Sequence, residues 1–568
     1  MLVPTSVLIL LLSQAPTQGA TLVNPPVGPG AMAPNLRVSK DAELLLTWLE
    51  PEENSEGKPA AHRLRFAKLK AGAWSEATTI ARGESLVANW ADFPSVARGA
   101  DGGLVAHWAE RSAASPYAYD VALGRSTDDG RSWRRIGPAH DDKTQTEHGF
   151  VSLLEDGAGV RAFWLDGRET AGAEGHDSHG AGAMTLRTVV LGKSLGGGEL
   201  LDERVCDCCG TAAAMTSEGP VVVYRNRDEN EVRDIFILRR TKRGWSQPRP
   251  VYPDGWRVPG CPVNGPSVAA RGRRVVVAWY TYAGDRPRVR VAFSDDAGAT
   301  FGTPLNVDGP TGGRVPLGRV DVVLRENGTA LVSWLASQRE EASLLVRMIA
   351  ADGRKGKELL VTKTGADRQS GFPRMEQLGA QLFFAWTAAE TPSQVRVAWL
   401  PVAGVPPAAT ATEAPQQPPL LATLTPGQPA PAYSAVTLEG AKVSLAGERG
   451  HAVLVNLWAT WCEPCRFELP ELAALHERHA PKGLRVIGVS VDSQRTAAEV
   501  RDFVTRRKLP YAFWHDPADQ ASRTFRSETL PASFLFDKRG TLVWRTVGTV
   551  RANDPGLEAA IQRALESP

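Results

Sequence analysis

The apolar run His451-Ala-Val-Leu-Val-Asn-Leu-Trp-Ala459 leads into Trp461-Cys-Glu-Pro-Cys465 and then into Arg466-Phe-Glu-Leu-Pro-Glu-Leu-Ala-Ala-Leu-His476. The run predicts a buried strand, and the segment after the cysteines predicts a helix. The two cysteines would then lie where a strand feeds the first turn of a helix. A helix N-terminus favours the thiolate, which is the species that attacks a disulfide. The pattern therefore indicates a site of thiol–disulfide exchange.

A structural zinc site is the alternative explanation of a Cys-x-x-Cys motif. Such a site needs a second pair of ligands, and no cysteine follows Cys465 in the chain. Redox chemistry is therefore the favoured interpretation of this motif.

Three segments together resemble the TlpA/ResA-type thioredoxin-like domains, which are tethered or exported to the extracytoplasmic side of bacterial membranes. They are Val455-Asn-Leu-Trp-Ala-Thr-Trp-Cys-Glu-Pro-Cys465, Glu468-Leu-Pro470 and Leu530-Pro-Ala-Ser-Phe-Leu-Phe-Asp537. The resemblance covers residues 424–568. It implies an α/β thioredoxin-like fold and a thiol–disulfide oxidoreductase that acts on a protein thiol or disulfide and requires no cofactor at its redox site.

The resemblance also implies roles for single residues. Cys462 would be the exposed nucleophile and Cys465 the buried resolving thiol. Pro531 would be a cis-proline that lies against the disulfide and pairs with the substrate backbone, and Glu468 would be the carboxylate beside the active site. The supporting positions are Trp461, Glu463, Pro464 and Asn456.

Asn456 departs from thioredoxin itself, which has a buried Asp at this position. Because an amide cannot titrate, Glu468 is the better candidate for a general base. The alternative is that Glu468 is only a solvated residue of the first helical turn, where a negative charge is favourable.

The resemblance implies a reductant that is recharged by a membrane electron donor. The acidic Glu463 between the two cysteines is consistent with this direction, because a nearby carboxylate disfavours the thiolate of the reduced form.

The N-terminus predicts export. Val7-Leu-Ile-Leu-Leu-Leu12 and the small residues ending at Gly19-Ala20 are typical of a signal peptide over residues 1–20, although no Lys or Arg precedes the apolar run. The run is too short for a transmembrane helix, so we expect no membrane span in the mature chain and a periplasmic or otherwise exported protein. A net charge of +2 gives no indication of nucleic-acid binding.

The composition divides the chain of 568 residues into domains. Residues 403–423 form a Pro/Ala-rich segment that predicts an extended linker. It would separate a first domain at 21–402 from the second at 424–568 and let the second swing relative to the first.

The first domain repeats. An apolar strand ending in an aromatic residue recurs every 52 to 60 residues, at Trp48, Trp108, Trp164, Tyr224, Trp279, Trp334 and Trp386. A four-stranded unit at this period predicts a β-propeller. Seven aromatic strands indicate seven blades, with Thr21-Leu-Val-Asn24 completing the last one, and a six-bladed ring is the alternative.

Two turns, Ser126-Thr-Asp-Asp-Gly-Arg-Ser-Trp133 and Ser294-Asp-Asp-Ala-Gly-Ala-Thr-Phe301, match the Asp-box Ser-x-Asp-x-Gly-x-x-aromatic. The first domain therefore resembles the sialidase/BNR-repeat propellers over residues 21–402. Sialidases carry a Phe/Tyr-Arg-Ile-Pro motif, and the nearest counterpart is Leu36-Arg-Val-Ser39, so glycosidase activity is disfavoured.

The remaining cysteines and three histidines are expected to converge. The connections between successive blades emerge on one face of a propeller, and those before blades three, four and five carry His148, the Cys206-Asp-Cys208-Cys209 segment and Cys261. A loop within blade three on the same face adds His176 and His179.

Thiolates with imidazoles indicate a copper or zinc site, and this metal site is one of three open interpretations. The second is one or two structural disulfides, such as Cys261 with a cysteine of the cluster. The third is unpaired thiols. Two functional classes therefore remain. The chain is either a thiol–disulfide oxidoreductase whose propeller binds a partner or a metal, or a metal- or glycan-binding propeller whose cysteines are kept reduced by the redox domain.

Overall fold

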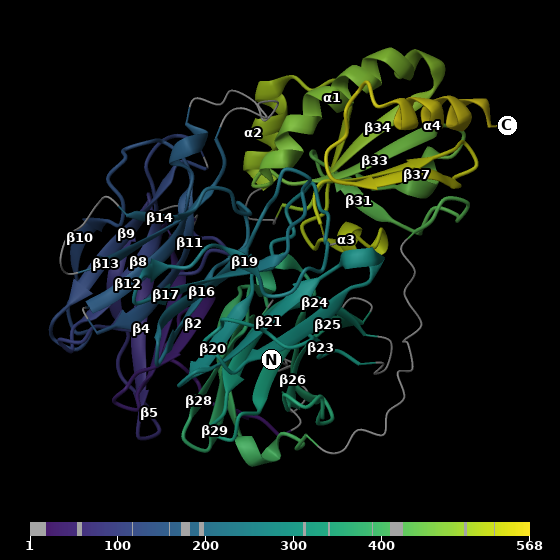
Figure 1. The fold of residues 1–568 in the computed structure, drawn as a ribbon. Helices are drawn as coiled ribbons and strands as arrows, with labels where there is room; N and C mark the ends of the chain where they lie inside the picture. Colours follow the sequence, from purple (N-terminus) through teal and green to yellow (C-terminus); the bar gives the residue numbers. More distant parts are fainter. Residues whose placement is uncertain are drawn as a thin grey trace, which may run out of the picture.

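The computed structural model describes residues 19–53, 59–115, 117–157, 159–171, 182–191, 198–309, 314–338, 341–388, 390–408, 424–492, 497–527 and 529–567. A ring of small β-sheets comes first, and a C-terminal domain that contains the α-helices follows it (Figure 1). The expected signal peptide lies almost entirely outside the described residues, as do residues 409–423 of the expected linker.

The ring consists of seven blades. Blades 1 to 4 are β2 (Met32–Val38), β3 (Leu44–Glu53), β4 (Pro59–Lys70), β5 (Ala73–Trp74) and β6 (Thr78–Gly83); β7 (Ser95–Arg98), β8 (Leu104–Arg111), β9 (Tyr119–Ser126) and β10 (Arg134–Pro138); β11 (His148–Asp156), β12 (Gly159–Asp166), β13 (Thr185–Leu191) and β14 (Glu199–Asp202); and β15 (Ala212–Thr216), β16 (Gly219–Arg225), β17 (Ile235–Thr241), β18 (Gly244–Trp245) and β19 (Arg249–Pro250).

Blades 5 to 7 are β20 (Ser267–Arg271), β21 (Arg274–Thr281), β22 (Arg288–Ser294) and β23 (Leu305–Asn306); β24 (Val315–Leu324), β25 (Ala330–Gln338), β26 (Glu341–Ile349) and β27 (Leu359–Gly365); and β28 (Arg374–Leu378), β29 (Gln381–Ala388), β30 (Gln394–Pro401) and β1 (Thr21–Leu22). The short 3-10 helices are η1 (Arg168–Thr170), η2 (Ala283–Asp285), η3 (Arg368–Ser370), η4 (Val402–Gly404), η5 (Leu445–Glu448) and η6 (Ala480–Lys482).

The first strand of each blade lines the centre of the ring. Each of these strands contacts the first strand of the next blade, and β2 of blade 1 contacts β28 of blade 7. Strand β1 pairs with β30, with Thr21 opposite Trp399, so the N-terminal segment completes the last blade. The prediction of seven blades is confirmed, and the six-bladed alternative is wrong.

The repeating aromatic residues explain why the blades stack. Each lies in the second strand of its blade, and all seven are at most 3% exposed. A large ring at the same place in every sheet fills the space between neighbouring blades, where a smaller side chain would leave a cavity.

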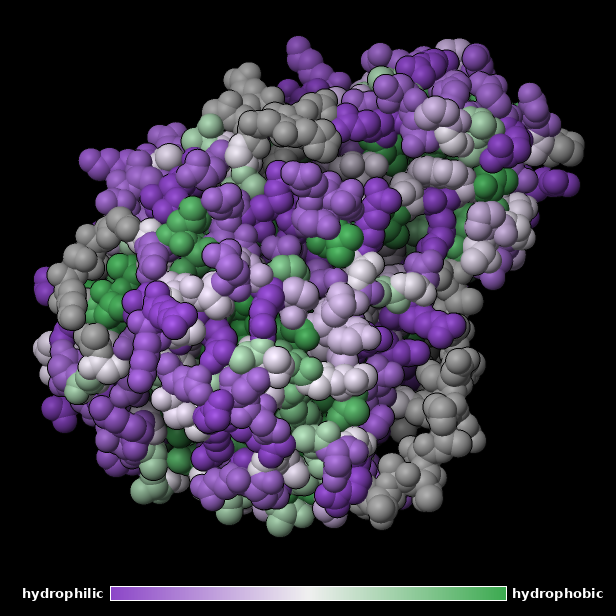
Figure 2. Space-filling model, in the orientation of Figure 1, coloured by the Kyte–Doolittle hydropathy of each residue, from purple (hydrophilic) through white to green (hydrophobic). Residues whose placement is uncertain are grey.

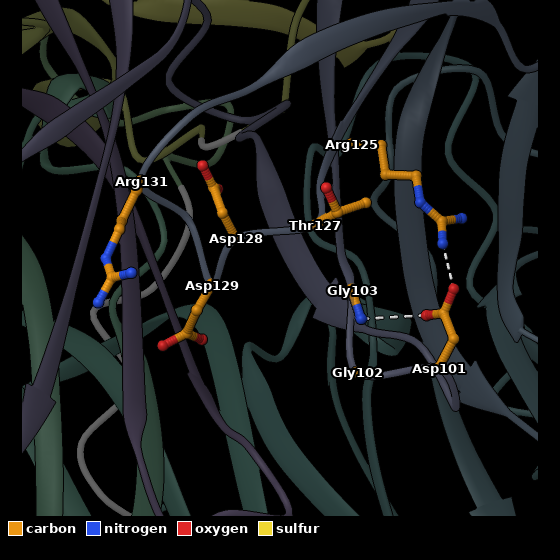
Figure 3. A pocket seen from close by; sticks show the side chains of 8 residues that line it. All are labelled: Asp101, Gly102, Gly103, Arg125, Thr127, Asp128, Asp129 and Arg131. Carbon is orange, nitrogen blue, oxygen red and sulfur yellow. Dashed lines mark hydrogen bonds and ion pairs between the residues drawn. The ribbon is translucent and has the colours of Figure 1, made fainter.

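The two Asp-box segments form turns between the third and fourth strands of blades 2 and 5. Asp128 Oδ1 accepts the backbone N–H of Ser132 at 2.9 Å, and Asp296 Oδ1 accepts that of Thr300 at 2.7 Å. A hollow beside the first turn is lined by Asp101, Arg125 and Asp128 among others (Figure 3). It opens on the face that carries the turns between the first and second strands and between the third and fourth strands of each blade. The connections between blades lie on the opposite face.

The C-terminal domain is a seven-stranded sheet with four α-helices in its described part. Its strands are β31 (Ser434–Thr437), β32 (Lys442–Ser444), β33 (Ala452–Trp458), β34 (Leu484–Ser490), β35 (Ala512–His515), β36 (Ala532–Phe536) and β37 (Leu542–Val547), in the order β32-β31-β35-β34-β33-β36-β37. Its helices are α1 (Glu463–His479), α2 (Ala497–Arg507), α3 (Gln520–Thr524) and α4 (Pro555–Glu566). Strand β33 is central and buried along its length, as predicted.

The C-terminal domain packs on the propeller (Figure 1). Its core cluster is continuous with propeller residues that include Phe150, Val205 and Cys261. This docked arrangement differs from the expected swinging domain, and aromatic contacts, hydrogen bonds and ion pairs between the domains are its physical cause.

The outer surface is polar over most of the face in Figure 2, where apolar side chains lie in small separate patches. Among the described helices, none is both long and apolar enough to cross a membrane.

Candidate functional site

Cys462 and Cys465 lie at the start of α1 and form a disulfide. Cys462 is the N-cap residue, and its Sγ accepts the backbone N–H of Cys465 at 3.3 Å. Pro464 stands in the first turn, where a missing N–H costs nothing. The helix N-terminus therefore faces the sulfur that would carry the thiolate charge after reduction. The side chain of Glu463 lies outside the described residues.

Glu468 lies one helical turn after Cys465 and is buried. Burial raises the pKa of Glu468 to about 8, although hydrogen bonds from the Val550 N–H at 2.8 Å and the Asn456 side chain at 2.6 Å oppose the shift. The alternative of a solvated first-turn residue does not fit this burial. A carboxyl group with this pKa can exchange protons near neutral pH.

The propeller pairs with the loop before Pro531. The Leu530–Pro531 peptide bond is cis. The backbone N–H of Cys261 donates to the carbonyl of Leu530 at 2.7 Å, and the two residues form an antiparallel β-bridge. The predicted role of Pro531 is to pair with a substrate backbone, so the segment around Cys261 occupies the place expected for a substrate.

Two glycines permit this close approach. A Cβ on Gly260 would lie 2.6 Å from the Leu530 carbonyl oxygen, and a Cβ on Gly548 would lie 2.4 Å from the Pro259 side chain. Real side chains do not tolerate such distances, so only glycine fits at these points of contact.

Cys462 is buried in this arrangement, with 0% of its surface exposed, and so is Cys465. The expectation of an exposed Cys462 is therefore not met in the docked state. Propeller side chains pack on the neighbouring Trp461. Trp461 packs edge-on against Trp90 at 6.1 Å between ring centroids, and the Arg368 guanidinium lies over Trp461 at 5.0 Å.

Polar contacts hold the same interface. Tyr117 Oη donates to the Thr460 carbonyl at 2.7 Å, and Arg368 pairs with Asp519 at 3.3 Å. Sequence reasoning did not identify Trp90, Tyr117 or Arg368 because nothing in their local pattern marks a residue that binds another domain.

The four propeller cysteines gather beside this interface as free thiols. Cys206 Sγ lies 3.3 Å from Cys209 Sγ and 3.8 Å from Cys208 Sγ, and Cys208 is hydrogen-bonded to Cys261. Cys208 and Cys261 belong to the same core cluster as Cys462 and Cys465. The connections before blades 4 and 5 therefore bring the four thiols together, and Cys208 and Cys261 lie on the side of this group that joins the core of the C-terminal domain.

Comparisons with known proteins match the C-terminal domain. Residues 426–545 match the profile of the AhpC/TSA family. The thiol-disulfide oxidoreductase ResA of Bacillus anthracis is 34% identical over 122 residues, which are 22% of this chain and 69% of the relative. The thioredoxin-like protein YneN of Bacillus subtilis is 34% identical over 125 residues, which are 22% of this chain and 72% of the relative.

The chain belongs to the ResA family of thiol–disulfide oxidoreductases. The matched part is its C-terminal domain, called the ResA-type domain below. A solved thiol:disulfide interchange protein of the thioredoxin family from Chlorobium tepidum is similar at 28% identity, with a TM-score of 0.22, covering 25% of this chain and 97% of the other.

The charge of the cysteine cluster is concentrated on Cys206. Burial raises its pKa, but hydrogen bonds from Cys208 and Cys209 and the charge of Arg233 together lower the pKa well below its usual range. Arg233 Nη1 lies 3.3 Å from Cys206 Sγ and 3.2 Å from Asp207 Oδ1. Burial raises the pKa of Cys208 and Cys209, so the cluster holds one thiolate that neutral thiols and a buried guanidinium stabilise.

His148 lies elsewhere. It sits at the start of β11 and stacks on His140, which sequence reasoning missed, and the sulfur atoms of the described cysteines are not part of that group. His140 could have been found, because it stands in the connection between blades 2 and 3 just before His148. His176 and His179 lie outside the described residues.

A cavity of about 570 Å³ lies between the domains beside Thr529. Trp256 and Tyr280 of the propeller and Arg523 and Arg545 of the ResA-type domain line it. The interface therefore leaves space next to the Cys261–Leu530 pairing.

Substitution of Glu468 tests its role in proton transfer. We expect the attack of Cys465 on a mixed disulfide to accelerate through about pH 8, because only ionised Glu468 can accept the thiol proton. Glu468→Gln keeps the size of the side chain and one of the two acceptor oxygens but removes the titration, so it should slow the step by about a hundredfold above that pH. Rapid-quench measurement over a pH series checks this, and an unchanged profile in the variant would rule the role out.

Substitution of Gly260 tests the docking of the C-terminal domain on the propeller. Gly260→Ala places a methyl group against the Leu530 carbonyl without altering either domain, so it should separate the domains. External dithiol should then reduce the Cys462–Cys465 disulfide severalfold faster. Gly157→Ala is the matched control, because its Cβ would meet nothing within 4 Å. Equal reduction rates in the two variants would contradict the docked arrangement.

Proposed function

We propose that this protein is an exported reductant whose ResA-type domain acts on the cysteine cluster of its own propeller. The observation that carries the proposal is the pairing of Cys261 with Leu530, next to the cis-proline. A protein substrate of this family presents its cysteine by the same kind of backbone pairing, according to the resemblance noted above. Here the residue so presented is itself a cysteine.

The exchange would proceed in two steps. The Cys462 thiolate attacks Cys261 in a Cys208–Cys261 disulfide, which forms a Cys462–Cys261 bond and releases the Cys208 thiolate to take a proton. The Cys465 thiolate then attacks Cys462, closes the Cys462–Cys465 disulfide and releases Cys261. Two electrons pass into the propeller, and a dithiol donor at the membrane would restore the ResA-type domain.

The charges of the cluster support this direction. The disulfide in the ResA-type domain and the free thiols in the propeller correspond to the end of the exchange. Stabilisation of a thiolate on Cys206 by Arg233 disfavours any disulfide that would use Cys206, and so favours the fully reduced cluster.

The purpose of a reduced cluster would be to bind a soft metal ion. Cys206, Cys208 and Cys209 present sulfur atoms within 4.8 Å of one another, and Cys261 adjoins them. Thiolates select copper(I) or zinc, and only reduced cysteines can bind them. Among the described residues, glycan binding has no comparable support. Arg37, which belongs to the nearest counterpart of the sialidase motif in the sequence, donates to the Leu153 carbonyl at 2.6 Å.

Location in an oxidising compartment outside the cytoplasm would explain why the thiol cluster and a reducing domain are joined in one chain. An oxidising environment converts neighbouring thiols to disulfides, so a thiol cluster there needs a source of electrons. The apolar run over residues 7–12 and the small residues up to Ala20 support export and cleavage near residue 20.

Removal of the resolving thiol should trap the exchange. In the full chain, Cys465→Ser should accumulate a Cys462–Cys261 mixed disulfide after mild oxidation of the cluster, because no second thiolate can release it. Peptide mapping identifies the linked pair. Cys462→Ser should trap nothing, and Cys465→Ser combined with Cys261→Ser should lose the bond to the propeller. Equal trapping by both single variants would refute the assigned roles.

The reduced full chain should bind about one copper(I) ion per molecule and release it when the cluster is oxidised, because a disulfide offers no thiolate. Thiol counting and metal analysis on the same samples measure both quantities. Cys206→Ser should weaken binding strongly, whereas Cys462→Ser should leave it unchanged in protein that is already reduced. Cysteines that resist mild reduction and retain no copper would show a structural disulfide patch instead.

A further inference from the structure

The propeller carries a second cluster of metal-binding side chains, apart from the cysteines, on the connection between blades 2 and 3. His140 follows β10, and His148 begins β11. Their imidazole rings stack with centroids 3.8 Å apart and planes inclined by only 5°. Both side chains are buried, at 3% and 0% exposure, so water does not satisfy their nitrogen atoms.

The Nδ1 atom of each ring has a hydrogen-bond acceptor. His148 Nδ1 lies 3.2 Å from the carbonyl oxygen of Thr146, and His140 Nδ1 lies 2.7 Å from Asp142 Oδ1. A carbonyl can only accept a hydrogen bond, so Nδ1 of His148 carries its proton, and the carboxylate of Asp142 has the same effect on His140. In the neutral rings, both lone pairs are therefore on Nε2.

Three buried acceptor atoms meet at this point. Among the described residues, Nε2 of His140 and Oδ1 of Asp120 are buried without a hydrogen-bond partner, and a carboxylate oxygen of Asp142 lies 3.2 Å from Nε2 of His148. The two Nε2 atoms and the Asp120 oxygen lie within 4.8 Å of one another, and His140 Nε2 is 3.7 Å from Asp120 Oδ1. Buried lone pairs that face one another are unfavourable unless a cation or a proton lies between them.

The surrounding charges favour a cation. His148 Nε2 lies 3.2 Å from Asp142 Oδ2 and 3.7 Å from Asp166 Oδ1. Arg168 contacts both carboxylates, at 3.3 Å and 2.7 Å, and the Arg187 guanidinium lies 3.8 Å from Asp166. Three carboxylates and two guanidinium groups leave a net negative charge around the two imidazoles.

We propose that Asp120, His140 and His148 bind a divalent transition-metal ion of the zinc class. Two imidazole nitrogens and one carboxylate oxygen are a common ligand set for such an ion and leave a fourth position open. A histidine ligand usually donates its other N–H to a carboxylate or a backbone carbonyl, and both histidines do so here. This site is independent of the cysteine cluster and of its redox state.

Cobalt(II) is the probe that separates this site from the thiols. In the full chain with the cysteine cluster oxidised, so that no thiolate can bind the ion, one Co²⁺ should bind with weak ligand-field absorption and without the intense sulfur-to-metal charge-transfer bands that thiolate ligands produce. Added Zn²⁺ should displace it and should raise the thermal unfolding midpoint, because the ion binds only the folded chain.

Asp120→Asn and His148→Ala should each weaken Zn²⁺ binding by at least about tenfold. His107→Ala is the matched control, since His107 is a buried histidine in β8 whose Nε2 also has no hydrogen bond but which lies outside the cluster. Asparagine has nearly the same shape as the half-buried Asp120 that it replaces, so we expect Asp120→Asn to fold. This variant therefore still tests the proposal if His148→Ala fails to fold.

Two results would overturn the proposal. One is Zn²⁺ affinity that is the same in the wild type and in Asp120→Asn. The other is a folded wild-type chain that binds Co²⁺ only when the cysteine cluster is reduced, with thiolate charge-transfer bands. Either result would mean that Asp120, His140 and His148 do not hold a metal ion.

Discussion

The backbone hydrogen bond from Cys261 to Leu530 is the interaction on which the arrangement of this protein depends. The two chains can approach closely enough to form it because glycines stand at the tightest points of contact, Gly260 and Gly548. A single hydrogen bond contributes little net free energy in water. Here the covalent connection between the domains keeps the partners at high effective concentration, so even a weak pairing is populated.

Electrostatics separates the propeller face into two chemical environments. On the connections before blades 4 and 5, the cysteine cluster carries one negative charge on Cys206, which the positive charge of the buried Arg233 stabilises. On the connection before blade 3, imidazoles and carboxylates share a negative field that two guanidinium groups only partly offset. The cysteine sulfurs and the imidazole and carboxylate ligands thus lie on neighbouring but separate connections. Such a separation allows one protein to present two sites that prefer different metals.

The sequence predicted the elements with strong local signals. The aromatic positions from Trp48 to Trp386 marked the second strand of every blade, because burial between blades demands a large ring at a fixed place in each repeat. The rule that connections between blades share a face also predicted that Cys206 and Cys261 would meet. That rule predicts the face on which a loop lies but not which other loops it contacts. The sequence therefore grouped His148 with the cysteines, whereas the structure places it against His140. Local sequence reasoning could not predict the docking of the two domains, because Trp90 and Arg368 lie far from Trp461 in the chain and contact it only through the shapes of two folded surfaces.

The burial of Cys462 has a kinetic consequence. In the proposed exchange, the donor that returns electrons to the ResA-type domain could not pair with Leu530 while the Cys261 segment does. The two partners would then pair there in turn, and each catalytic cycle would include a separation of the domains. A very stable interface would protect the cluster but halt the supply of electrons, so the rate of opening sets an upper limit on turnover.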